Sequence, residues 1–268
     1  MMKFSLFIVL KILNGVNPAD WDYHNLGEWP RVCQTGHSQS PIDIKKWGMK
    51  KEFTQMIHYH NFERSHSATI SNTGHTVEVR FTDQNRYPLI IKNGILPGEY
   101  VLDNIHFHWG SEHTFNNKRY AFETHLVHYL RQAGSLARAL QMENGVVVLA
   151  VLSEIHHRDT TQGFIEIANS VANVARRLEQ PISLGSTICP DDFLPKYNRD
   201  FFLYRGSLTT PNCTEGVHWL VYEQPLNIRN SELDSLTKIY DKNSNEITQS
   251  YRPIQNLNGR TVRYICEI

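Results

Sequence analysis

The stretch around which this chain is organised reads HFHWGSEH at residues 106–113 and, after nine intervening residues, ETHLVH at residues 123–128. His106 and His108 stand two positions apart, and in a β-strand such residues point to the same face of the sheet. A neighbouring antiparallel strand can bring His125 against both of them. Three nitrogen ligands with one open position are typical of a catalytic zinc site, whereas structural zinc sites usually have four protein ligands.

A His-x-His pair alone is more often an ordinary surface feature than a metal site. The pair His58 and His60 has no carboxylate-flanked third histidine close behind it, and we interpret it as surface. The pair at 106 and 108 differs because Glu112 and Glu123 lie close by in the sequence. Metal-bound imidazoles need a hydrogen-bond acceptor for their other ring nitrogen, so the two nearby carboxylates favour metal binding.

The overall composition excludes several classes of protein. With 268 residues, of which 40% are hydrophobic, the chain can bury a full core as one domain or at most two. The formal net charge is zero, so no basic surface indicates a nucleic-acid partner. No apolar run is long enough to predict a membrane span.

The N-terminal residues 1–19 predict a signal peptide, followed by a single domain over residues 20–268. Lys3 provides a positive start and residues 4–10 a short apolar core, although Lys11 interrupts it. The alternative is a hydrophobic segment that stays attached. The signal peptide predicts a secreted protein.

Four cysteines remain to be placed: Cys33, Cys189, Cys213 and Cys266. None of them forms a CxxC pair, which argues against a cysteine zinc cluster. In a secreted protein one or two disulfides are expected, but spacing alone leaves all three pairings open.

The chain reads as a series of strands with few helices. Residues 39–44 predict a proline-marked turn that enters a strand. We predict further strands in the segments 68–70, 75–81, 89–91, 100–109, 120–130, 145–152, 216–222 and 261–266. The apolar run at 145–152 suits a central strand buried on both faces. The fold class is therefore α+β, a single domain on a large, mixed and mostly antiparallel sheet.

Two helices are predicted at the periphery of this sheet. The first spans Thr161 to Leu178, with apolar residues at helical spacing and Pro181 beyond its end. The second is capped by Asn230 or Ser231 and continues to Tyr240.

Six motifs give the chain a resemblance to a known family. They are QSPIDI (39–44), SNTGHTVEV (71–79), HFHWGSEHT (106–114), ETHLVHY (123–129), GSLTTP (206–211) and VHWLV (217–221). In this order they resemble the α-class carbonic anhydrases, and the likeness runs from about Trp21 to Arg263. It implies one domain on a twisted sheet of roughly ten strands, with zinc at the bottom of a conical cleft.

The resemblance implies a lyase that hydrates carbon dioxide reversibly to bicarbonate and a proton, by attack of a zinc-bound hydroxide. His106, His108 and His125 resemble the Zn²⁺ ligands. Thr209 resembles the residue that donates a hydrogen bond to Glu112 and accepts one from the metal-bound group.

Further roles follow from the same resemblance. His75 resembles the proton shuttle, because a histidine titrates in the range this relay needs. Tyr23 resembles the tyrosine that holds the relay waters. The substrate pocket would be formed by side chains that are mostly apolar: Val127, Val148, Leu208, Thr210 and Trp219.

Behind the ligands, Glu123 is expected to accept from His125. Asn104 occupies the place where the family usually has glutamine behind the first histidine, so a shorter side chain must reach that ring. Glu78 fills a rim position that is often asparagine.

The resemblance also pairs Cys33 with Cys213, as in secreted members of the family. For Cys189 and Cys266 we slightly favour a second bridge over free thiols.

Two other classes of function were weighed against the enzyme. A catalytically silent, carbonic-anhydrase-like binding domain typically lacks one or more ligand histidines, and here all three are present. A mineral-associated matrix protein would be expected to carry acidic or repetitive extensions, which this sequence lacks. We expect a monomer or weak dimer whose partner is a small-molecule substrate.

Overall fold

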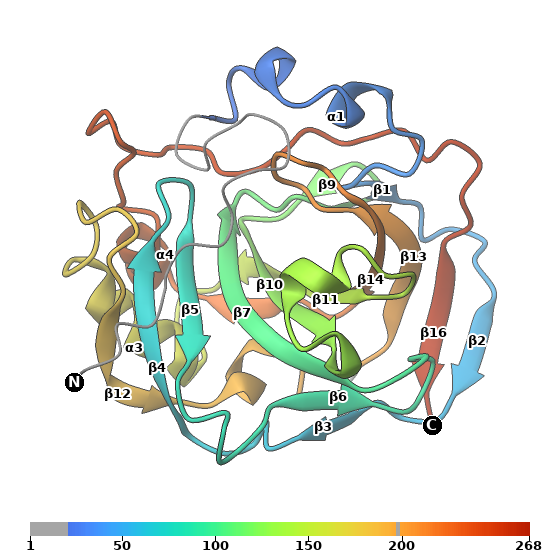
Figure 1. Ribbon diagram of the computed structural model, residues 1–268, viewed down its shortest axis with the longest axis horizontal. Helices are drawn as coiled ribbons and strands as arrows, with labels where there is room; N and C mark the ends of the chain where they lie inside the picture. The colour runs from blue at the N-terminus through green and yellow to red at the C-terminus, as the bar shows by residue number, and fades with distance from the viewer. Residues whose placement is uncertain (1–20, 197–198) are drawn as a thin grey trace.

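The computed structural model describes residues 21–196 and 199–268, so the predicted signal peptide at 1–19 lies outside the described residues (Figure 1). The strands are β1 Asp43–Ile44, β2 Lys51–Thr54, β3 His58–His60, β4 His66–Asn72, β5 Val77–Phe81, β6 Ile90–Lys92, β7 Tyr100–Trp109, β8 Thr114–Phe115, β9 Lys118–Arg119, β10 Phe122–Leu130, β11 Val146–Ile155, β12 Ile182–Ile188, β13 Phe201–Ser207, β14 Glu215–Tyr222, β15 Leu226–Ile228 and β16 Arg263–Glu267. The α-helices are α1 Val32–Thr35, α2 Leu136–Ala139, α3 Gln162–Val171 and α4 Asn230–Leu236. Short 3₁₀ helices lie at Leu26–Glu28, Arg131–Ala133 and Pro190–Phe193.

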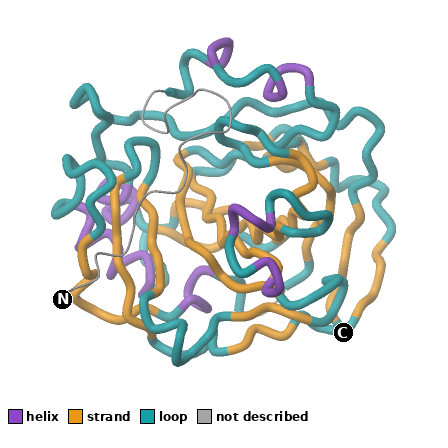
Figure 2. Tube along the Cα trace, viewed as in Figure 1, coloured by secondary structure: helices purple, strands orange, loops and turns teal. Residues whose placement is uncertain are grey.

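One large sheet dominates the molecule. Its strand order is β12-β4-β5-β7-β10-β11-β14-β13-β16-β2, with β3, β6 and β15 attached beside this path. Most neighbours are antiparallel, while β14 and β15 run parallel to β11 and β2 runs parallel to β16. Figure 2 shows how little helix accompanies the sheet. The predicted α+β domain on a large, mostly antiparallel sheet is confirmed.

The central strand β11 is buried on both faces, as predicted from its apolar run. Val147, Leu149 and Val151 belong to the larger core, which also contains Phe107 and the buried apolar side chains of α3. The alternate residues Val146, Val148, Ala150 and Leu152 belong to a second core on the other face, together with Trp219. Strict alternation along β11 therefore divides the molecule into two layers.

Both predicted helices are shorter than expected. Helix α3 ends at Val171, and the chain continues in turns with bonds such as Val174 N to Val171 O. Asn72 Nδ2 binds the carbonyl oxygen of Ala175, so this carbonyl is satisfied from outside the helix. Helix α4 ends at Leu236, and Arg229 is its N-cap without a side-chain cap bond, so the predicted asparagine or serine cap is wrong.

A β-bulge in β7 bears on the site described below. Val127 pairs with Asn104 and His128 pairs with Leu102, so Asp103 has no partner of its own on β10. Leu102 and Ile105 both belong to the larger core, which leaves Asp103 and Asn104 side by side on the opposite face. Such a bulge shifts the alternation of a strand by one residue and re-aims a side chain.

Candidate metal centre

Three histidine rings converge on one face of the sheet. His125 on β10 lies directly opposite His106 on β7, and His108 lies two residues further along β7. The ring centroids are 5.1 Å apart for His106 and His125, 4.5 Å for His108 and His125, and 5.2 Å for His106 and His108. One nitrogen from each ring lies within 4.8 Å of the others. The spacing in the sequence therefore predicted a real cluster.

The other nitrogen of each ring is held by a partner behind it. Asn104 Oδ1 lies 2.9 Å from Nδ1 of His106, and Glu123 Oε1 lies 2.7 Å from Nε2 of His125. The carbonyl oxygen of Ser250 is the partner of Nδ1 of His108. These contacts leave Nε2 of His106, Nε2 of His108 and Nδ1 of His125 facing one another, with 3.3 Å between the first and the last.

The inward nitrogen of His108 lacks any hydrogen-bond partner among the described residues, although it is buried. Unpaired buried polar atoms are rare because they lose their bonds to water. A metal ion at the centre of the cluster explains this nitrogen, since it would accept the lone pair. Three imidazoles, each with its outer nitrogen held, form a donor set that suits zinc.

The surroundings of His106 and His108 keep their imidazole rings neutral, which is the state that can bind a metal. Burial, followed by the neighbouring rings of His125 and His108, holds the pKa of His106 well below its ordinary value. Burial also lowers the pKa of His108, although Glu112 opposes the shift. Neutral imidazoles keep a lone pair free for a cation at neutral pH.

Glu123 connects the cluster to a deeper network. Its Oε1 also lies 2.7 Å from Nδ1 of His113, and its Oε2 accepts from the backbone N–H of His113 at 2.8 Å. Burial alone would raise the pKa of Glu123, but His113 and His125 together hold it well below its ordinary value. The hydroxyl group of Tyr204 lies 2.7 Å from the remaining nitrogen of His113. His113, Glu123 and His125 also lie close enough together to hold a metal. Both ring nitrogens of His113 are already occupied, however, so His106, His108 and His125 are the better candidate ligands.

Glu112 and Thr209 are both buried, as the predicted pair requires. Glu112 Oε1 accepts from the backbone N–H of Arg252 at 2.8 Å, and its Oε2 lies 3.6 Å from Nε2 of His108. This Oε2 has no hydrogen-bond partner among the described residues, so the bond from Thr209 is not formed. The pairing of Thr209 with Glu112 therefore stays a prediction.

The C-terminal segment provides two partners that sequence reasoning missed. Ser250 contributes its carbonyl oxygen to His108, and Arg252 contributes its N–H to Glu112. The Arg252 guanidinium binds the backbone of Cys33 and Ser40 and the side chain of Gln39. Backbone donors and acceptors leave no signature in a sequence, which is why these partners were not found.

His75 stands in the turn between β4 and β5. Its ring stacks on the ring of Trp21 with 3.7 Å between centroids and 14° between planes. Tyr23 contacts the edge of the same indole at 5.0 Å between centroids. Burial, and then the charge of Glu112, raises the pKa of Tyr23 well above its ordinary value, so its hydroxyl group stays protonated. The N-terminal arm thus joins His75 and Tyr23 through Trp21, which the sequence did not single out.

The predicted apolar wall forms a row across three strands. Val127 on β10 pairs with Val148 on β11, which pairs with Trp219 on β14. Trp219 lies against the His125 ring at 4.8 Å between centroids. Leu208 packs on the same core and is half-buried, as is Thr210. An apolar surface therefore continues from the third histidine.

Cys33 and Cys213 form a disulfide with 5.2 Å between their Cα atoms. It ties α1 in the N-terminal arm to the loop that follows Thr209. Cys189 and Cys266 are free, so the second bridge that we slightly favoured is wrong. Cys189 instead donates from its thiol to the carbonyl oxygen of Phe62.

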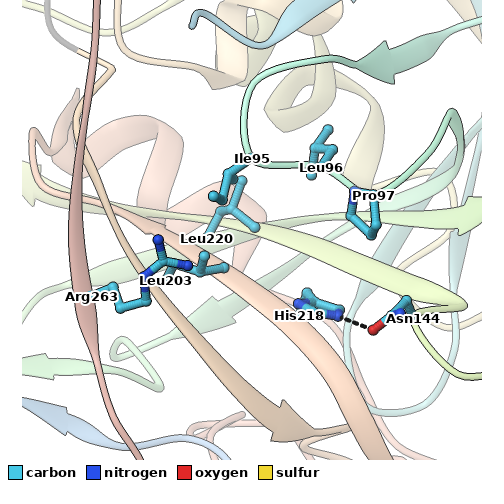
Figure 3. A pocket seen from close by; sticks show the side chains of 8 residues that line it. All are labelled: Ile95, Leu96, Pro97, Asn144, Leu203, His218, Leu220 and Arg263. Atoms are coloured by element: carbon cyan, nitrogen blue, oxygen red, sulfur yellow. Dashed lines mark hydrogen bonds between the residues drawn. The ribbon is translucent and has the colours of Figure 1, made fainter. Parts of the chain in front are cut away.

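A separate cavity of about 200 Å³ has none of the three clustered histidines among its lining residues, which Figure 3 shows. Leu203 and Leu220 line it from the larger core, together with the loop residues 95–97. Its polar members already have partners, since Nε2 of His218 lies 2.8 Å from Oδ1 of Asn144 and Arg263 binds Glu52. No reactive group is left to act there among the residues that line it.

None of the helices in the described residues is long and apolar enough to cross a membrane. The exposed histidines His58 and His60 confirm that the other His-x-His pair is a surface feature.

Comparison with known proteins points in one direction. The sequence profile for eukaryotic-type carbonic anhydrase matches residues 16–266. Carbonic anhydrase 6 of Bos taurus is 33% identical over 246 residues, which cover 85% of this chain and 72% of that protein. Carbonic anhydrase 3 of Homo sapiens is 28% identical over 239 residues, which cover 85% of this chain and 89% of that protein.

Proposed function

Since the chain belongs to the eukaryotic-type carbonic anhydrase family, we propose that it catalyses the reversible hydration of carbon dioxide to bicarbonate and a proton, with zinc as cofactor. The observation that carries this proposal is the convergence of one ring nitrogen from each of three histidines, because the nitrogen from His108 is buried and has no hydrogen-bond partner among the described residues.

His106, His108 and His125 would hold the zinc. When bound, the ion supplies a water-derived nucleophile at neutral pH, an effect of which the carbonic anhydrase family itself is the standard example. Neutral imidazoles suit this task because, unlike thiolates, they do not cancel the charge of the cation. Glu123 and Asn104 fix the orientation of two of these rings from behind.

Glu112 and Thr209 would control one proton next to the ligands. An ionised carboxylate can only accept, so a threonine hydroxyl that donates to Glu112 can only accept on its other side. The unpaired Oε2 of Glu112 is the acceptor available for this contact. Thr209 would therefore accept a hydrogen bond only from a group that can donate one. That group would keep a lone pair free to face the substrate.

The row of Val127, Val148 and Trp219 would receive carbon dioxide. This molecule offers weak hydrogen-bond acceptors and no donor, so a dry wall beside the histidines is a suitable receptor. Burial of all three side chains supports this role, because the wall then carries little water that the substrate must displace.

His75 would carry protons between the site and the solvent. An imidazole titrates near neutral pH and can therefore both accept and release a proton there. Its stacking on Trp21 holds the ring at one position over the N-terminal arm. Tyr23, which stays protonated and contacts the same Trp21 ring as His75, would order the water between His75 and the histidine cluster.

We also propose that the protein is secreted after removal of residues 1–19. The disulfide between Cys33 and Cys213 supports this localisation, because such bridges persist mainly in oxidising compartments.

The test of the proposed function is to measure metal content and carbon dioxide hydration on the same purified protein. One equivalent of zinc with hydration that a chelator abolishes and zinc restores is the expected result. A protein that holds zinc but does not accelerate hydration would instead be a binding domain.

A further inference from the structure

A chain of hydrogen bonds leads from His106 to the surface of the sheet. Asn104 Oδ1 lies 2.9 Å from Nδ1 of His106, and Asn104 Nδ2 donates to Asp103 Oδ2 at 2.9 Å. Arg80 Nη1 donates to the same Asp103 oxygen at 2.8 Å. Arg80 also forks onto Glu78 through Nε at 2.6 Å and Nη2 at 3.1 Å.

The β-bulge in β7 makes this arrangement possible. In a regular strand Asp103 and Asn104 would point to opposite faces of the sheet. Because Asp103 has no partner on β10, both side chains lie on the face that carries the histidines. The neighbouring strand β5 places Glu78 opposite His106, and Arg80 follows two residues later on the same face.

The orientation of the Asn104 amide decides which nitrogen of His106 is protonated. If its NH₂ group faced the ring, Nδ1 would have to accept and the proton would sit on Nε2, where it blocks a metal. A carboxylate accepts but does not donate, so Asp103 draws the NH₂ group toward itself. The amide oxygen then faces Nδ1, which must carry the proton and leaves Nε2 with a free lone pair.

Arg80 supports Asp103 in turn. Although burial opposes its charge, the carboxylates of Glu78 and Asp103 outweigh that effect and raise the pKa of Arg80 above its ordinary value. The guanidinium group therefore stays charged, and it holds the same Asp103 oxygen that accepts from Asn104.

We infer that Asp103 and Arg80 are positioning residues, which act through Asn104 to set the His106 tautomer that binds metal. This inference rests on the proposed function, because it takes the three histidines to be zinc ligands. It adds two residues that neither the sequence motifs nor the ligand spacing indicates, and it explains how asparagine serves behind the first histidine.

The first test measures zinc release from purified holoprotein into an excess of a chromogenic chelator. Asp103→Ala should release zinc about tenfold faster, the lower end of the effect of removing a group behind a ligand. Asp103→Asn keeps an oxygen that can accept from Asn104 and Arg80, so it should stay close to wild type. Glu99→Ala, which removes a half-exposed partner of Lys92 and Arg131 elsewhere, is the matched control and should change nothing.

The second test reads the tautomer directly in metal-free protein with ¹⁵N-labelled histidine. Wild type should show His106 protonated at Nδ1, whereas Asp103→Ala should show a mixture of both forms. Neither readout requires hydration activity, so a protein without that activity can still confirm the positioning role.

Wild-type zinc release together with a single Nδ1 tautomer in Asp103→Ala would overturn the inference. If Asp103→Ala does not fold, Arg80→Ala decides, since it alters only a half-exposed side chain. Arg80→Ala should release zinc about two- to threefold faster, which is the size of effect expected when a partly exposed ion pair is lost. An unchanged release rate would count against the inference.

Discussion

His125 lies directly across from His106 on adjacent antiparallel strands, and Nδ1 of His125 is 3.3 Å from Nε2 of His106. His106 turns its Nε2 and His125 turns its Nδ1 toward the shared centre, because Asn104 and Glu123 bind the other nitrogen of each ring. Both rings are side chains on paired strands, so removing either one should remove the metal and leave the strands intact.

His125→Ala should fold and lose zinc, because two imidazoles cannot hold the ion as three do. The measurement is zinc content after gel filtration, together with far-ultraviolet circular dichroism. His60→Ala, which removes an exposed histidine of β3, is the control and should keep one equivalent of zinc. Full zinc occupancy in His125→Ala would contradict the assignment of the ligands.

His75→Ala should keep zinc and slow only the release of protons. The deficit should reach about tenfold or more in weakly buffered solution, in line with the loss of a positioned proton carrier. Added imidazole should restore most of the rate, because a free base can take the place of the missing ring. Equal hydration by variant and wild type at low buffer concentration would exclude the shuttle role.

Cys33→Ser should destabilise the fold far more than Cys189→Ser. The bridge closes a loop of 180 residues in sequence separation. The chain-entropy account gives roughly 5 kcal/mol for a loop of that size. Cys189 is free and half-buried, so its replacement should cost about 1 kcal/mol or less. Urea unfolding of both variants measures the difference, and similar midpoints would contradict the structural role of the bridge.

Acid should destabilise the metal-free protein in part through His128. Burial lowers the pKa of this histidine to about 3, although its bond to the Leu126 carbonyl opposes the shift. In the unfolded chain the same ring titrates near 6.5. Between these two values the unfolded state binds a proton that the native state excludes, so stability falls as the pH decreases from about 6.5.

The slope from this one residue is about 1.4 kcal/mol per pH unit within that window. Comparing urea unfolding of metal-free wild type and His128→Asn at several pH values measures it. The variant should lose this part of the pH dependence, while His58→Asn, an exposed control, should keep all of it. Parallel pH profiles for wild type and His128→Asn would show that the buried ring does not titrate on unfolding.

Much of the fold was visible in the sequence because alternation of apolar residues reports burial. Strand β7 was predicted with its observed bounds, Tyr100 to Trp109. Strand β13 was missed, since its run Phe201 to Tyr204 is apolar at every position and shows no alternation. The helix α3 pattern was overextended because spacing cannot reveal that Asn72 captures the Ala175 carbonyl group.

Some residues of the candidate site could likewise be predicted from the sequence, and others could not. Side chains with a chemical signature, such as the three histidines and Glu112, were found. Ser250 and Arg252 act through their backbones, and Asp103 acts only because a bulge turns it toward Asn104. Neither a carbonyl oxygen nor a shift in strand register can be read from residue types.

The division of β11 between two cores has a consequence for how this protein can change. Val148 belongs to the wall beside His125, while its neighbours Val147 and Leu149 face the opposite layer. A single inserted or deleted residue would exchange the two sets and spoil both layers at once. Evolution or engineering can therefore vary the width of this apolar wall by substitution within β11, but differences in chain length must be absorbed by the turns that flank it.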